Sequence, residues 1–170
     1  MLSYMLYECD APKVKLEKEI SMIKEYLALE KIRQGERLEL TFQINGNING
    51  QLISPLLLLP FVDNSLSFGS NELVEQAWVN LDINIENNSL SMKLINGVPA
   101  MMPAYTENDL QALTNVQKRL QLLYPNRHEL KINVEQELLM VHLNLKLEEA
   151  IQEDQTNNKT LQPDLNYAAV

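Results

Sequence analysis

The chain of 170 residues has little of several residue types that define common protein classes. Its one cysteine, Cys9, can form no internal disulfide, and two histidines are too few for a Cys/His zinc site. Apolar runs are short: the run at residues 56–59 stops at Pro60, and none approaches the ~20 residues of a membrane-spanning helix. Residues 1–8 have neither a basic lead nor a small-residue cleavage site, so we expect no secretory signal and a cytoplasmic location.

Basic residues are also scarce. The 14 Lys and Arg against 23 Asp and Glu give a net charge of −9. Such a charge repels the phosphate backbone of nucleic acids and anionic lipid surfaces, so we expect no nucleic-acid partner. The remaining composition, 45% hydrophobic and 22% charged, is ordinary for a globular domain, which excludes disorder of the whole chain.

Hydrophobic spacing predicts the elements of the first half. A helix over residues 15–34 follows from an apolar stripe and ends at Gly35, and alternation over residues 38–44 predicts a strand. The pair Ser54-Pro55 is typical of a helix start, so a second helix is expected over residues 55–68, with a kink or a late start at Pro60.

The second half reads as a hairpin, a loop, a helix and two strands. Alternation over residues 79–85 and 90–94 predicts the hairpin, and two prolines place residues 96–105 in a loop. A helix follows, with Thr106 and Asp109 as a capping pair, and two strands close the domain over residues 130–134 and 139–145.

These elements predict an α/β fold, a two-layer sandwich in which a mixed sheet of about five strands has helices on one face. Three regions follow from the pattern. Residues 1–34 form a helical segment, residues 35–148 form the sandwich, and residues 149–170 form a mobile polar tail.

Three strings carry a family resemblance: residues 27–33 (LALEKIR), residues 55–64 (PLLLLPFVDN) and residues 115–124 (NVQKRLQLLY). With the order of elements, they resemble the C-terminal ATP-binding domain of LytS/YehU-type sensor histidine kinases, which have the Bergerat (GHKL) fold. The resemblance covers about residues 2–147. It implies that the helical segment of residues 1–34 ends a dimerisation or linker region and that residues 35–148 form the ATPase-like sandwich. It implies a phosphorelay of a two-component system, in which ATP phosphorylates a histidine and a response regulator receives the phosphoryl group.

The resemblance assigns the second string to the N-box. Asn64 matches the residue whose side-chain oxygen helps to hold Mg²⁺ against ATP, a hard ligand for a hard cation. Asp63 takes the acidic position, which is usually Glu. The usual basic and His positions after the Asn fall on Ser67 and Phe68, so two contacts to phosphate are absent.

The glycine boxes depart further from the family pattern. The first aligns with residues 95–99 (INGVP), where Ile95 replaces the Asp that binds the adenine amino group and Pro99 replaces the second Gly. The second aligns with residues 110–113 (LQAL), and the last with residues 135–138 (EQEL), both without glycine. Loss of one charge-assisted hydrogen bond costs roughly 1.5 to 3 kcal/mol, about ten- to a hundredfold in affinity.

The sequence therefore predicts a histidine kinase ATP-binding domain with an impaired nucleotide site. ATP and Mg²⁺ are the cofactors that the family implies, with Asn64, Asn96, Gly97 and Asn115 as the matching positions. No catalytic residue is assigned beyond the acidic position of Asp63, since neither His128 nor His142 lies in a phosphoacceptor string. The implied partners are dimerisation helices in a homodimer and a response regulator, with a membrane reached only through an upstream region.

Three alternatives stay open at this point. The domain is an active enzyme in which another carboxylate, such as Glu107 or Asp109, replaces the adenine contact, or a pseudokinase that signals through protein contacts without ATP. The third is an unrelated α/β binding domain of similar layering. Ordinary structural roles also account for single residues: Trp78 and the pair Met101-Met102 as core residues, and Arg119 as a cation near a helix end.

Overall fold

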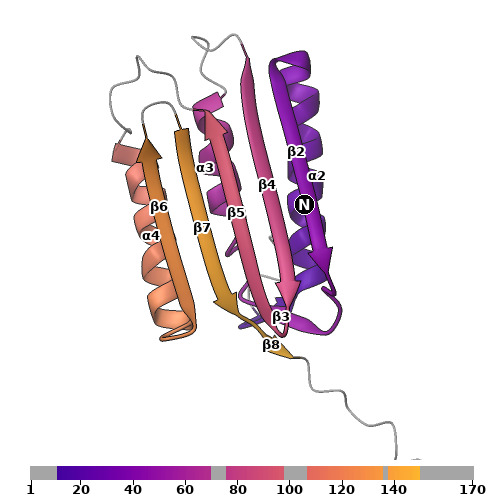
Figure 1. The fold of residues 1–170 in the computed structure, drawn as a ribbon, viewed down its shortest axis with the longest axis vertical. Coiled ribbons are helices and arrows are strands. Elements are labelled where there is room, and N and C mark those ends of the chain that lie inside the picture. Colours follow the sequence, from indigo (N-terminus) through magenta and orange to yellow (C-terminus); the bar gives the residue numbers. More distant parts are fainter. Residues whose placement is uncertain (1–10, 70–75, 98–106, 136–137, 150–170) are drawn as a thin grey trace, which may run out of the picture.

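The computed structural model describes residues 11–69, 76–97, 107–135 and 138–149. Figure 1 shows the arrangement of the elements. In chain order they are β1 (Val14–Lys15), α2 (Leu16–Gln34), the 3-10 turn Gly35–Arg37, β2 (Leu38–Gly46), β3 (Gln51–Ile53), α3 (Leu59–Gly69), β4 (Ala77–Glu86), β5 (Ser89–Gly97), α4 (Glu107–Leu123), β6 (His128–Glu135), β7 (Leu138–Lys146) and β8 (Glu148–Glu149).

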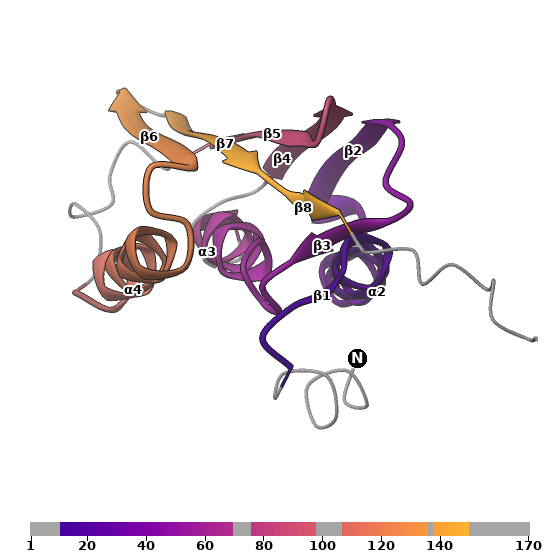
Figure 2. The same ribbon diagram turned by 90° about the horizontal axis from the view of Figure 1, so that it is seen from below.

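Five strands form the main sheet in the order β2-β4-β5-β7-β6, with β2 parallel to β4 and the other neighbours antiparallel. Helices α2, α3 and α4 all lie on one face of this sheet, and α3 lies between the other two (Figure 2). The predicted two-layer α/β sandwich is confirmed. A second sheet of three short strands, β1-β3-β8, was not predicted. Among the described residues, no helix is both long and apolar enough to cross a bilayer.

Alternating side chains along the strands build the core. In β4 every second residue from Ala77 to Ile85 faces the helices, and β5 continues the layer with Leu90, Met92 and Leu94. The helices contribute large apolar side chains in return, including Phe61 and Tyr124, both fully buried. Each such side chain stabilises the fold by roughly 1.5 to 3 kcal/mol relative to an exposed position.

The predicted start of the second helix at Ser54-Pro55 is wrong, whereas the late start at Pro60 is confirmed. Helix α3 begins at Leu59, so that Pro60 lies in the first turn, where its missing N–H removes no helical hydrogen bond. The residues before it form a turn in which Leu56 has a φ of +51°. This left-handed conformation cannot continue a helix.

Two charged side chains hold this turn from opposite sides. The buried carboxylate of Glu19 in α2 accepts hydrogen bonds from the backbone N–H groups of Leu56 at 2.9 Å and Leu58 at 3.1 Å. The guanidinium of Arg119 in α4 donates to the carbonyl oxygens of Pro55 and Leu56, both at 2.9 Å. Arg119 therefore binds backbone rather than serving only as a cation near a helix end.

Two further expectations need correction. Trp78 is 38% exposed and is not a core residue. Side chains alternate along β4, and Trp78 is one of those that point to the sheet face away from the helices. His128 was expected in a loop but begins β6, and its Nδ1 lies 2.7 Å from the carbonyl oxygen of Tyr124. Expectations for Cys9, Thr106 and the pair Met101-Met102 lie outside the described residues.

Gly46 ends β2 in a conformation that excludes a side chain. Its φ is +92°, and an added Cβ would lie 1.9 Å from the carbonyl oxygen of Ile85 in β4. We predict that Gly46→Ala lowers the free energy of unfolding by about 3 kcal/mol or more, because strain and a backbone clash add. Gly50→Ala is the control, since Gly50 has a φ of +73° but open space around it, and its cost should stay at about 1 to 2 kcal/mol. Urea denaturation measures both, and equal losses would contradict the clash.

The contact of Arg119 with the turn gives a second prediction. Arg119→Ala leaves two carbonyl oxygens without their donor and should lower the free energy of unfolding by about 2 kcal/mol. The neighbouring Lys118 is exposed on the same helix, so Lys118→Ala should change it by less than about 0.5 kcal/mol. Thermal and urea denaturation measure the difference, and two equal effects would show that the Arg119 contact contributes nothing specific.

Candidate functional site

The predicted site residues come from three elements. Asp63 and Asn64 lie on α3, where Asp63 is exposed and Asn64 is only 4% exposed. Asn96 and Gly97 end β5, against which α3 packs, and Asn96 is only 1% exposed. Asn115 lies exposed on α4. Facing elements therefore carry the two buried amides, Asn64 and Asn96, whereas Asn115 is on the outside.

The carboxylate of Asp63 is engaged by α2. The Tyr26 hydroxyl donates a hydrogen bond to Asp63 Oδ1. Partial burial raises the pKa of the Tyr26 phenol well above its usual range, and the hydrogen bond to Asp63 and the negative charges of Asp63 and Glu30 raise it further. Tyr26 therefore stays protonated and donates at neutral pH, so one oxygen of the Asp63 carboxylate is already occupied.

The alternation of β5 decides which side chain faces the helices near its end. Ile95 points to the outer face of the sheet, between Asn80 of β4 and Met140 of β7 in the strand register. Asn96 points to the inner face, in line with Leu94 and Met92. The residue aligned with the adenine-binding Asp thus faces away from α3, and Asn96 takes the inward position.

Asn96 presents an acceptor on this inner side. Its Nδ2 donates to the carbonyl oxygen of Gly97 at 3.1 Å, which orients the amide. Its buried Oδ1 accepts no hydrogen bond from any residue in the part of the chain that the structure describes. A buried acceptor without a donor is costly unless a ligand or water supplies one, so this atom fits an exocyclic amino group such as that of adenine.

Gly97 has a structural role of its own. A Cβ at this position would lie 2.8 Å from Nε1 of Trp78, which packs over it on the outer face of the sheet. A side chain at Gly97 would therefore displace the indole of Trp78 from this position, independently of any ligand.

The region aligned with the second glycine box is helical. Helix α4 begins at Glu107, so residues 110–113 lie beyond its start, and Leu113 is buried. Backbone N–H groups from residue 111 onward point along the helix to carbonyl oxygens four residues earlier. They are not available to cradle phosphate as the N–H groups of a glycine loop are. The side chains of Glu107 and Asp109 lie outside the described ones.

Nucleotide and magnesium therefore fit the described residues unequally. Asn96 Oδ1 fits a purine amino group, but the helical backbone of residues 110–113 does not fit a triphosphate. Among the described residues no group of three or more His, Cys, Asp or Glu side chains could hold a metal ion. Of the predicted site residues on α3, Asn64 and the Asp63 oxygen that does not accept from Tyr26 are the candidate ligands for Mg²⁺.

Sequence reasoning missed Glu19, Tyr26 and the backbone role of Arg119. A signal for Glu19 was present, because it follows Leu16 by three residues and precedes Ile23 by four, which places a charge on the apolar stripe. A carboxylate on the buried face of a helix needs hydrogen-bond donors, and here they are the N–H groups before α3. Nothing in the spacing identified the pairing of Tyr26 with Asp63.

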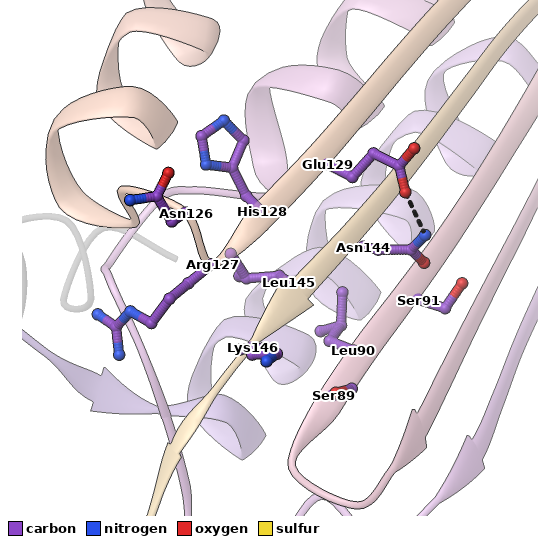
Figure 3. A pocket seen from close by; sticks show the side chains of 10 residues that line it. All are labelled: Ser89, Leu90, Ser91, Asn126, Arg127, His128, Glu129, Asn144, Leu145 and Lys146. Carbon is purple, nitrogen blue, oxygen red and sulfur yellow. Dashed lines mark hydrogen bonds between the residues drawn. The ribbon is translucent and has the colours of Figure 1, made fainter.

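A cavity of about 340 Å³ lies at the opposite end of the sheet, where β5 and β6 begin and β7 ends (Figure 3). Its lining includes Ser89, Ser91, Arg127, His128, Asn144 and Lys146. Arg127 is paired with Glu148 at 2.8 Å, and this bond lowers the pKa of the Glu148 carboxyl. None of the predicted site residues lines this cavity.

The sequence is similar to sensor proteins of bacteria, although no protein-family model matches the chain. It is 25% identical over 134 residues to the sensor protein LytS of Staphylococcus epidermidis, covering 72% of this chain and 23% of that protein. It is 26% identical over 131 residues to the sensor histidine kinase YpdA of Escherichia coli, again covering 72% of this chain and 23% of that protein. The chain therefore spans about a quarter of the length of these relatives.

Solved histidine kinase structures have the same fold. The catalytic domain of histidine kinase ThkA superposes with a TM-score of 0.52 at 11% identity, over 79% of this chain and 94% of that one. The mycobacterial sensor histidine kinase MprB superposes with a TM-score of 0.51 at 12% identity, over 81% of this chain and 97% of that one. Full-length ShkA in complex with AMPPNP gives 0.56 at 16% identity, over 82% of this chain and 31% of ShkA.

The strings in the sequence, the helix-backed mixed sheet and these similarities agree. The chain is similar in sequence to part of LytS-like sensor histidine kinases and has the fold of histidine kinase catalytic domains.

Proposed function

We propose that this domain takes part in the phosphorelay of a two-component system with a nucleotide site that is weakened relative to an active kinase. The observation that carries the proposal is the inner face of β5 at its end. It offers the neutral amide of Asn96, whose Oδ1 has no donor among the described residues, whereas the family pattern uses a carboxylate for the adenine contact. An amide oxygen accepts the same hydrogen bond as a carboxylate but without the charge that strengthens it.

The helix start supports the weakening of the phosphate side. With residues 110–113 inside α4, the phosphates lose backbone donors that the family's glycine box supplies. The net charge of −9 adds a general repulsion of polyphosphate. ATP and Mg²⁺ are therefore the proposed ligands of the site, at low affinity.

A pseudokinase is the second candidate, favoured by the occupied carboxylate of Asp63. In that role the domain binds no nucleotide and acts through contacts with its homodimer partner and a response regulator. In either role we place the domain in the cytoplasm, as part of a longer protein whose upstream region carries the phosphoacceptor histidine and any membrane anchor.

Nucleotide binding separates a weakened site from a competent one. At about 1 mM Mg-ADP or Mg-ATP, we predict that the free energy of unfolding rises by less than about 0.5 kcal/mol, corresponding to a Kd near or above that concentration. Differential scanning fluorimetry and urea denaturation with and without nucleotide measure the change, and Mg²⁺ alone is the control. A stabilisation of about 2.7 kcal/mol, the value for ligand at a hundred times Kd, would contradict the weakened site.

A pair of neighbouring variants tests the position of the purine contact. Asn96→Asp returns a charged acceptor to the inner face and should raise the affinity for Mg-ADP about tenfold. Ile95→Asp puts the same carboxylate on the outer face and should leave the affinity unchanged. Isothermal titration calorimetry measures both affinities, with samples of the two variants that contain the same fraction of folded protein. A gain with Ile95→Asp and none with Asn96→Asp would place the purine elsewhere.

A further inference from the structure

Besides apolar packing, two side chains of α2 form hydrogen bonds with the α3 segment. Glu19 accepts from the N–H groups of Leu56 and Leu58 at 2.9 and 3.1 Å, just before α3 begins. Tyr26 donates to Asp63 within α3 itself. The two residues are seven apart, two helical turns, so they lie on the same side of α2.

The Glu19 contact is buried and therefore strong. Glu19 is fully buried, and its two oxygens each accept one of the N–H groups. A buried carboxylate that loses its hydrogen-bond donors destabilises the fold strongly. A movement of α2 is therefore expected to carry the turn with it. The bonds from Arg119 stabilise the turn from the other side and offset the unfavourable left-handed φ of Leu56.

The Tyr26 contact acts on the site side chain directly. The phenol lies beside the carboxylates of Asp63 and Glu30 and the guanidinium of Arg33, which itself pairs with Glu30 at 2.5 Å. Its hydrogen bond turns the Asp63 carboxylate toward α2. Asp63 and Asn64 are adjacent in α3, so a shift of the helix moves both.

We propose that Tyr26 and Glu19 are positioning residues that couple α2 to the α3 site: Glu19 fixes where α3 begins and Tyr26 holds the Asp63 carboxylate toward α2. A displacement or rotation of α2 then alters the orientation of Asp63 and Asn64 together. The role of α3 as a nucleotide site rests on the proposed function, but the coupling is a property of the fold and is tested without nucleotide.

Hydrogen exchange of the 170-residue chain, resolved by NMR, tests the coupling. In Glu19→Gln and Tyr26→Phe, which keep side-chain size, amides of α3 should lose protection about tenfold relative to amides of β4 and β5. The matched control is Ser21→Ala, a change at an exposed position of the same helix. It should leave the protection of α3 relative to β4 and β5 unchanged. Unchanged α3 protection in both variants, or an equal loss in α3 and the sheet, would overturn the coupling.

A double-mutant cycle provides a readout that a purely structural role would not move. Tyr26→Phe and Asp63→Ala each remove the hydrogen bond between the two side chains, so the loss of α3 protection in the double variant should be smaller than the sum of the two single losses. Losses that simply add would show that the two side chains are not coupled.

Discussion

Successive side chains of β5 point to opposite faces of the sheet, and this alternation decides which of them can face the predicted site residues of α3. Three buried apolar residues, Leu90, Met92 and Leu94, face the helices, and the pairing of β5 with β4 on one side and β7 on the other fixes this register. A slip by one residue would expose the whole apolar set. The inward position at the strand end therefore belongs to Asn96, and no side-chain rearrangement can bring Ile95 to that face.

A second constraint is the turn that precedes α3. A left-handed leucine and two sets of unpaired backbone groups would be unfavourable in isolation. Glu19 accepts from the N–H groups and Arg119 donates to the carbonyl oxygens, so two charged side chains from different helices satisfy the backbone of one short segment. This arrangement ties the three helices into one layer and sets the position of the residues predicted to bind nucleotide.

Strong periodicity made the elements predictable. The stripe of α2, the alternation of β2, β4, β5, β6 and β7 and the family strings gave the architecture, because burial of one face is a local signal repeated many times. The start of α3 was misplaced because the Ser54-Pro55 signal competes with tertiary bonds from Glu19 and Arg119, which lie more than thirty residues away in the sequence. The short strands β1, β3 and β8 have too few residues for a pattern.

For the candidate site, the sequence predicts a set of positions, which stay a prediction, but not how their side chains are arranged. The resemblance pointed to Asp63, Asn64 and Asn96, yet it aligned Ile95 with the adenine contact, since an alignment of letters does not register the direction of a side chain. It also gave no indication that Tyr26 occupies Asp63, because hydrogen bonds between separate helices leave no local pattern.

The most direct test of a weakened nucleotide site is NMR of the side-chain amides during a titration with Mg-ADP. Signals of Asn96 and Asn64 report on the inner faces of β5 and α3 independently of any global effect on stability. The account predicts small shifts that still rise without saturation at about 1 mM. Saturation of both amide signals at about 10 μM or below would contradict it.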